Sequence, residues 1–463
     1  MLKKLLKSKF LSSGIWYTIG NMLIKGIVFL SLPIFTRLLS PEDFGYYNTY
    51  IAYQSIMSVV VGLGLSGCIK NAKIDYCNSY NEFVTSILSL DFIFLIVSVL
   101  VLNVVSLLFL KNNNLLFNNI LLITSSASTL IDIISAKWII ELKYKKYIAT
   151  AFCNTFLNIS LSIVFIKYVF KTQKYWGRII GESIPLILIG IIIVAYMVRK
   201  NKKIYELEYW KYALKIGIPL IPHMLSKILL IQFDRIMLNN ITGAAATGIY
   251  SCMYNLSSIL NVLLNSFDMV WIAWLYPKMA NKDYKTVKNM TKMYTTFFSI
   301  ICVCVSLVIP EVVKIFVSKD YWDGIDVLFL LIYVVYINFI YLFFVNVQFY
   351  YKDTVFSSIG TILAAVVNII INFCLIPEYG YMGAAIATII SYLVLSIAHY
   401  IIYKIRYKID VVSVRTLVMG VFVIAFMLMF IYMLREDFII RYVLLLIIGV
   451  ISCIMIYRKV KTQ

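Results

Sequence analysis

Residues 20–50 read GNMLIKGIVFLSLPIFTRLLSPEDFGYYNTY. An apolar run fills the first half of this stretch, a short polar segment follows, and a second apolar run begins near residue 44. Crossing a bilayer takes about 20 mostly apolar residues in a helix. The stretch therefore predicts the end of one membrane span, a tight turn and the start of the next. Lys25 lies near the middle of the first span, where a charge costs about 2.5–3.5 kcal/mol on insertion scales.

The same apolar pattern continues along the whole chain. Of its 463 residues 62% are hydrophobic, and the mean hydropathy is +0.89, which exceeds what a soluble core needs. The pattern predicts an all-α polytopic membrane protein with about 14 transmembrane helices. The expected spans are 14–36, 44–66, 84–110, 115–136, 147–168, 178–198, 213–233, 245–272, 293–317, 325–348, 355–376, 381–403, 413–434 and 438–457. The loops between them are too short for a soluble catalytic domain.

The net charge of +20 follows membrane topology and does not indicate nucleic-acid binding. Lysine and arginine gather in the N-terminus and in alternate loops, and the positive-inside rule then predicts that both termini are cytoplasmic. One loop disagrees with this orientation, because Lys167, Lys171, Lys174 and Arg178 fall on the outer side. The first ten residues, MLKKLLKSKF, predict a short interfacial helix on the anionic inner leaflet. No small-residue cleavage site follows them, so we expect this segment to be retained.

Two pairs of similar segments indicate an internal repeat. Residues 35–50 resemble 233–254, and residues 175–182 resemble 381–388 in the placement of glycine and tyrosine. An even number of spans per repeat puts both halves in the membrane with the same orientation, related by an axis along the membrane normal. We therefore expect two six-helix lobes with a cavity between them, followed by two additional spans. The predicted boundaries are 1–200, 201–408 and 409–463.

Cationic residues recur at similar places in the first span of each predicted lobe. Asn21 and Lys25 are four residues apart, as are His223 and Lys227, so each pair shares one helix face. The outer ends of the same spans carry Arg37 and Arg235. Lysine binds phosphate as a point charge and arginine binds it in a bidentate fork. The pattern predicts a cationic site for a phosphate or pyrophosphate group; the alternative is helix packing, with these side chains snorkelling or paired to acids.

Several acids lie in or beside the spans. Asp91, Glu182 and Asp268 are candidates for ion coupling, since an acid in a low-dielectric site can carry a coupling proton. The alternative is that each is the ion-pair partner of Lys25 or Lys227. Asp132 and Asp234 have similar positions within spans.

Motifs of catalysis and cofactor binding are missing from the sequence. It has no G-x-x-x-x-G-K-[ST] loop for a nucleotide and no H-E-x-x-H metal motif, and its eight cysteines have neither zinc nor disulfide spacing. With two histidines and no nucleophile–base set, the chain is expected to be neither an enzyme nor a cofactor-binding protein.

Three segments carry a resemblance to a known family: residues 20–50 quoted above, GIYSCMYNLSSILN at 248–261, and EYGYMGAAIATIISY at 378–392. Over roughly residues 10–405 the chain resembles the polysaccharide-transporter (Wzx-type) flippases of the MATE-like superfamily. The resemblance implies a bacterial inner-membrane protein that moves a polyprenyl-pyrophosphate-linked oligosaccharide, such as an O-antigen or capsule unit, to the outer leaflet. It also implies a cationic lumen, which Lys25, Lys227 and the Arg37/Arg235 pair fit by type and position.

The implied partners are the lipid-linked oligosaccharide, membrane lipids, and the polymerase and glycosyltransferases of the same process. One alternative is a MATE-type exporter of drugs or metabolites on the same scaffold, although such exporters favour an acidic lumen. A second is a membrane-embedded polysaccharide polymerase, although no outer loop is long enough for its usual arginine-rich segment. A third is a scaffold or receptor that transports nothing, for which the sequence offers no positive feature.

Overall fold

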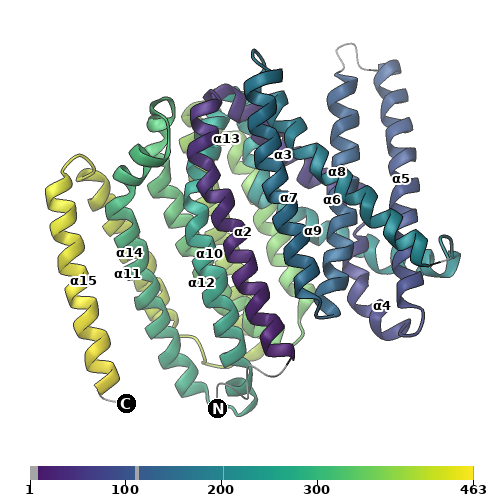
Figure 1. The fold of residues 1–463 in the computed structure, drawn as a ribbon. Coiled ribbons are helices and arrows are strands. Elements are labelled where there is room, and N and C mark those ends of the chain that lie inside the picture. Colours follow the sequence, from purple (N-terminus) through teal and green to yellow (C-terminus); the bar gives the residue numbers. More distant parts are fainter. Residues whose placement is uncertain (1–8, 110–113, 202, 462–463) are drawn as a thin grey trace. The chain divides into compact units, whose positions relative to one another are not determined.

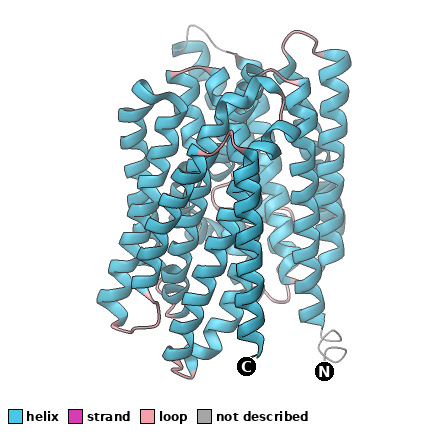
Figure 2. Cartoon of the chain, turned by 90° about the vertical axis from the view of Figure 1, so that its left-hand side faces the viewer, coloured by secondary structure: helices cyan, strands magenta, loops and turns pink. Residues whose placement is uncertain are grey.

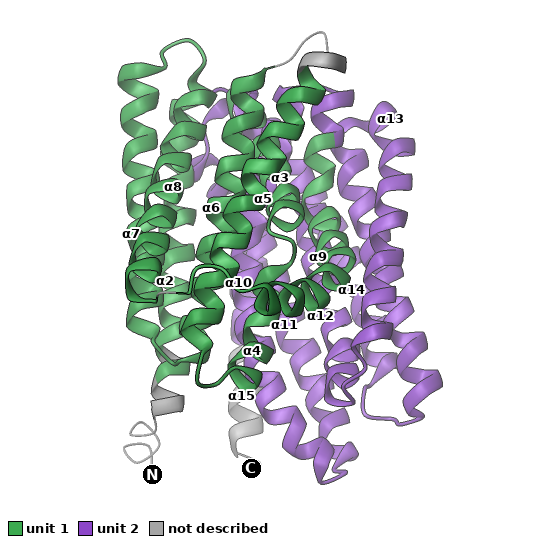
Figure 3. Cartoon of the chain, turned by 90° about the vertical axis from the view of Figure 1, so that its right-hand side faces the viewer, with its two compact units in different colours: residues 1–39, 43–236 green, residues 40–42, 237–463 purple. Residues whose placement is uncertain are grey.

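The computed structural model describes residues 9–109, 114–201 and 203–461. These residues form helices and connecting loops, without a strand among them (Figure 2). The interfacial helix predicted for the first ten residues falls mainly on 1–8, outside the described residues. The chain divides into two compact units, one made of residues 1–39 and 43–236 and the other of residues 40–42 and 237–463 (Figure 3). The six-helix repeat, with boundaries at 1–200, 201–408 and 409–463, stays a prediction.

The predicted all-helical membrane fold is confirmed. Within the described chain, eleven helices are long and apolar enough to cross a membrane. A bent pair, Pro41–Val61 with Leu65–Asp75, makes a twelfth if its two parts form one span broken by 55°. The 49-residue helix α13, Thr354–Ile402, contains a break at Gly380 (φ 55°, ψ −134°) between the two spans predicted at 355–376 and 381–403. It therefore accounts for both of them.

The helices of the first unit follow the predicted spans closely (Figure 1). They are α2 (Lys9–Leu38), α3 (Pro41–Val61), η1 (Leu65–Cys68), α4 (Ile69–Asp75), α5 (Tyr80–Phe109), α6 (Leu115–Ile140), α7 (Tyr144–Val164) with the π-helical turn η2 (Phe165–Val169), and α8 (Lys174–Lys200). Helix α9 (Leu207–Ile241) begins in this unit and ends in the second. Most of these helices extend a few residues beyond the apolar runs, because the polar ends continue the same backbone hydrogen bonding.

The core of the first unit gathers at one end of α5, α6 and α9. Phe83 and Ile87 of α5 are fully buried with Ile133 of α6, and Tyr209 and Ala213 of α9 complete this cluster. Helix-period spacing places the apolar side chains of each helix on one face, so the three helices share a core at this end.

A close backbone approach ties the turn after α3 to α9. A Cβ atom on Gly64 would lie 2.5 Å from the carbonyl oxygen of Gly217, and one on Gly217 would lie 2.5 Å from the carbonyl oxygen of Leu63. Gly64 also has a positive φ of 63°. Only glycine meets both conditions, since other residues adopt this backbone region at a cost and fill the space between the two segments.

Replacing Gly64 by alanine is therefore expected to lower the stability of the protein by more than the roughly 1–2 kcal/mol of left-handed backbone strain alone. The measurement is the shift in melting temperature of the detergent-purified protein. The matched control is Gly14→Ala, because nothing lies within 4 Å of a Cβ at that helical position. A Gly64→Ala protein as stable as the control would contradict the role given to this contact.

The second unit packs around α12 (Ile325–Tyr350), which is mostly buried. Its other elements are α10 (Ala244–Ala280), α11 (Tyr284–Phe316), η3 (Lys319–Gly324), α13 with the π-helical turn η4 (Tyr403–Tyr407), α14 (Val414–Met433) and α15 (Phe438–Lys461). Helices α14 and α15 both pack against α11. Arg441 of α15 is fully buried and donates to the Glu311 carboxylate, with Nη1 to Oε2 at 2.7 Å and Nη2 to Oε1 at 2.5 Å. This bidentate pair fixes the last helix to the unit.

Candidate functional site

A polar cavity of about 390 Å³, open on one side, is lined by α3, α6, α8 and α9 of the first unit. Its lining residues are Ile51, Gln54, Ser55, Ser58, Ser128, Asp132, Glu182, Leu186, Ile228, Ile231 and Gln232. Two carboxylates, Asp132 and Glu182, share this cavity, whereas its described lining includes no lysine or arginine. The cavity is therefore suited to a cation or a proton and unsuited to an anion.

Helical spacing explains how each helix contributes. On α6, Ser128 and Asp132 are four residues apart, and on α8 the same spacing separates Glu182 from Leu186. Residues four apart lie one above the other on a helix face, so on each of these two helices the lining residues share the face toward the cavity. The cavity is lined by four helices that are distant in the sequence.

Two of the lining serines donate their hydroxyl hydrogens to backbone carbonyls of their own helix, α3. The Oγ of Ser55 donates to the carbonyl of Ile51 at 2.8 Å, and the Oγ of Ser58 donates to the carbonyl of Ser55 at 2.8 Å. Their oxygen lone pairs remain as acceptors. Hydroxyl and carboxylate oxygens are the ligand types that small hard cations prefer.

Glu182 is held in place by two other side chains of the first unit. The hydroxyl of Tyr47 donates a hydrogen bond to Glu182 Oε2, and Arg178 Nη2 lies 4.0 Å from the same oxygen. Arg178 and Glu182 are four residues apart on α8, which places them on one helix face. The carboxylate that lines the cavity is thus one end of an ion pair.

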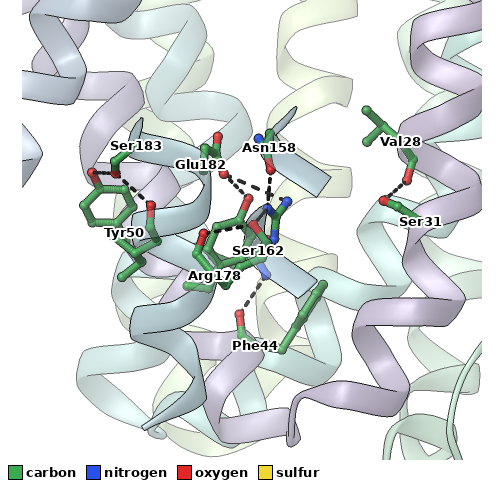
Figure 4. A network of polar contacts seen from close by, with 12 residues as sticks. Val28, Ser31, Phe44, Tyr50, Asn158, Ser162, Arg178, Glu182 and Ser183 are labelled. Carbon is green, nitrogen blue, oxygen red and sulfur yellow. Dashed lines mark hydrogen bonds and ion pairs between the residues drawn. The ribbon is translucent and has the colours of Figure 1, made fainter. Parts of the chain in front are cut away.

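The Arg178 side chain is buried in a network that Figure 4 shows from close by. Its Nη1 donates to Asn158 Oδ1 and to Ser162 Oγ, the latter at 2.7 Å. Its guanidinium carbon lies 4.1 Å from the ring centroid of Phe35 and 4.5 Å from that of Tyr47, which are cation–π distances. Hydrogen bonds, ring faces and the neighbouring carboxylate together compensate for removing this charge from water.

The sequence analysis counted Arg178 with the outer loop, as the first residue of the span predicted at 178–198. Helix α8 begins four residues earlier, at Lys174, and buries Arg178 in its second turn. The difference arises because the apolar run starts at Ile179, although the helix starts earlier. The four-residue spacing of Arg178 and Glu182 was the available signal for an ion pair on one helix.

The predicted cationic residues lie outside this cavity. On α2, Asn21, Lys25 and Arg37 are all exposed, and the Tyr147 hydroxyl donates to Asn21 Oδ1 at 2.9 Å. Lys227 of α9 is exposed as well.

The other two members of that predicted group are less accessible. His223 is partly buried, and its Nδ1 has no hydrogen-bond partner within the described chain. Arg235 is buried. The six residues therefore include three exposed cations, and their role in anion binding stays a prediction.

The predicted coupling acids have different surroundings. Only Glu182 lines the polar cavity. Asp91 is fully buried and accepts a hydrogen bond from Ser126 Oγ at 2.6 Å. Asp268 accepts one from Asn346 Nδ2 at 2.6 Å and lines a space of about 10 Å³, which holds at most about one water molecule. Among the described residues, no three His, Cys, Asp or Glu side chains are grouped so that they could hold a metal ion.

Comparison with known proteins places the chain in a family. Residues 10–281 match the family described as Polysaccharide biosynthesis protein. The capsular polysaccharide biosynthesis protein CapF of Staphylococcus aureus is 25% identical over 403 residues, which cover 83% of this chain and 97% of CapF.

Two solved structures show the fold. The inward closed conformation of the lipid II flippase MurJ superposes with a TM-score of 0.75 at 16% identity, covering 96% of this chain and 99% of MurJ. An inward-facing multidrug resistance MATE transporter of the MOP superfamily gives 0.65 at 14% identity, covering 84% and 98%. The chain belongs to the polysaccharide biosynthesis protein family, and it is a multi-pass membrane protein with the fold of MurJ and the MATE transporters.

Proposed function

We propose that this protein is a flippase, which moves a polyprenyl-pyrophosphate-linked oligosaccharide from the cytoplasmic to the outer leaflet of the bacterial inner membrane. Lys25 carries this proposal: it is an exposed cation in the middle of an apolar span, in a chain of a polysaccharide biosynthesis family. The fold is similar to that of a protein named as a lipid flippase. Transport by alternating access requires no covalent chemistry, so we assign no enzymatic activity.

Lys25 is the residue we assign to the pyrophosphate. An exposed ammonium within a span is costly unless it meets an anion or water, which makes such a residue a functional candidate. Asn21, one turn before it, accepts a hydrogen bond from Tyr147 and keeps its amide donors for an oligosaccharide or phosphate oxygen. Lys227 and His223, four residues apart on α9, form the second cationic pair in the proposal.

The polar cavity is the site we assign to a coupling ion or proton. Asp132 and Glu182 supply two carboxylates there, and the Arg178 network fixes Glu182. Asp91 and Asp268 are not assigned this role, because neither lines the polar cavity: Asp91 is fully buried, and Asp268 lines a space of about 10 Å³.

Charge distribution supports the proposed orientation, with both termini in the cytoplasm. The enzymes that build the lipid-linked unit would then act on the side where it is loaded, and the polymerase on the side where it is released. Those glycosyltransferases and the polymerase are the proposed functional partners.

A MATE-type exporter of cationic compounds is the second candidate function. The observation in its favour is the same cavity, because two carboxylates without a basic lining residue suit a cationic substrate. The similarity in fold to a multidrug MATE transporter shows the scaffold alone.

Depletion of the protein in its own host is the experiment that separates the two. The flippase function predicts that complete polyprenyl-linked oligosaccharides accumulate on the cytoplasmic side and that surface polysaccharide is lost. The measurements are mass spectrometry of extracted lipid-linked intermediates and an assay of surface polymer. Unchanged intermediates, together with increased retention of cationic dyes, would instead support the exporter.

A further inference from the structure

A second, separate groove of about 500 Å³ lies between α6, α7 and α8 of the first unit. It is at the end of the unit where α2 begins. The Trp16 and Tyr144 rings stack there at 6.1 Å, and the Tyr17 hydroxyl donates to the carbonyl of Trp138 at 3.0 Å. Figure 3 shows the neighbouring α2 and α7 running down to this end. The groove shares no lining residue with the polar cavity.

Four lysines and one glutamate line the groove: Lys137, Lys143, Lys146, Lys200 and Glu141. Glu141 binds two of the lysines, with Lys137 Nζ at 3.1 Å from Oε1 and Lys143 Nζ at 2.6 Å from Oε2. The groove therefore has more positive charge than its single acid can balance.

The other two lysines face one aromatic ring. Lys146 Nζ is 5.6 Å and Lys200 Nζ is 6.0 Å from the ring centroid of Tyr196. Neither has an ion-pair partner within the part of the chain described. Two ammonium groups brought toward one ring repel each other, and an anion between them would relieve that repulsion.

The rest of the groove is apolar. Ile193 and Met197 of α8 are buried in its floor, with Ile134 of α6 beside them. On the same helix the lining residues Ile192 and Tyr196 are 66% and 51% exposed, so an apolar strip of the groove is open to the surface. A ligand that fits this arrangement needs a negative head and an apolar body.

We propose that this groove binds an anionic phospholipid, with the phosphodiester between Lys146 and Lys200 and the acyl chains along the isoleucines of α8. Basic pockets between transmembrane helices at the cytoplasmic surface suit anionic headgroups, and this end is the one we orient toward the cytoplasm. Inorganic phosphate would leave the apolar strip uncovered, and a zwitterionic lipid would leave the charge unbalanced. The inference does not depend on what the protein transports.

The test is native mass spectrometry of the full-length protein in detergent, titrated with phosphatidylglycerol or phosphatidylethanolamine. The wild type is expected to bind one phosphatidylglycerol more tightly than phosphatidylethanolamine. The variant K146Q/K200Q is expected to lose about 10- to 30-fold in phosphatidylglycerol affinity, because each basic residue near an anionic lipid contributes about 1 kcal/mol, or roughly fivefold in affinity. Its phosphatidylethanolamine binding should stay unchanged.

The matched control is K145Q/R199Q. These two residues adjoin Lys146 and Lys200 in the sequence, are also exposed, and carry the same total charge, yet they do not line the groove. The control is expected to retain affinity within about twofold, in line with the small contribution of exposed charges. Equal losses in both double variants would show general surface attraction and would overturn the site.

Two competition arms identify the occupant. If millimolar inorganic phosphate displaced the lipid completely, the groove would be a phosphate site and the lipid assignment would be wrong. If undecaprenyl pyrophosphate bound at the lysines in preference to phosphatidylglycerol, the groove would belong to the transport substrate. Retention of phosphatidylglycerol in both arms, with loss only in K146Q/K200Q, supports the proposal.

Discussion

Replacement of Lys25 by glutamine is expected to reduce the export of lipid-linked oligosaccharide by about 10- to 150-fold, since one hydrogen bond to a charged group contributes about 1.5–3 kcal/mol. Glutamine keeps a polar end and most of the length of the side chain, and it removes the charge. The loss should therefore report on binding of the pyrophosphate and leave folding intact. The measurement is the ratio of lipid-linked intermediate to surface polymer in cells that carry only the variant.

Two further variants make the result specific. Lys25→Arg keeps the positive charge and is expected to retain most of the export. Leu23→Ala changes an exposed side chain two residues away, which is 62% exposed, and is expected to export normally. Normal export by Lys25→Gln at the wild-type protein level would rule out the pyrophosphate role of this residue, even if depletion had already shown the protein to be a flippase.

Replacement of Arg178 by glutamine is expected to cost about 3–5 kcal/mol of stability, because removing one partner of a buried ion pair leaves the other charge uncompensated. The partners left behind are Glu182, Asn158 and Ser162, together with the ring of Tyr47. The measurement is the melting temperature of the purified protein, with the amount of folded protein in the membrane as a second readout.

Arg199→Gln is the matched control for this prediction. It removes the same charge from the exposed end of the same helix and is expected to change stability by less than about 0.5 kcal/mol. The double variant R178Q/E182Q is expected to recover part of the loss, because neither charge is then left alone. If the Arg178→Gln and Arg199→Gln proteins had the same melting temperature, the network in Figure 4 would not contribute to the stability of the protein.

The sequence alone determined the fold class and the place of the long helices, whereas the break after Val61 and the short helix α4 were not predicted. Bilayer thickness sets the length of an apolar run, and a local count of apolar residues can therefore find the spans. Even the break at Gly380 in α13 was visible, as the gap between two predicted spans. Charge asymmetry between loops gave the proposed orientation in the same local way.

The sites depended on the tertiary structure. Asp132 and Glu182 are 50 residues apart in the chain, and their shared cavity also needs α3 and α9. Lys146 and Lys200, on different helices, meet at one tyrosine ring. In a span almost every position is apolar, so hydropathy does not show which helix face meets which neighbour; small differences in packing decide that. For this reason the sequence could identify charged residues within the spans. Only the packed helices showed that the Arg178 side chain is buried beside Glu182, whereas the Lys25 side chain is exposed.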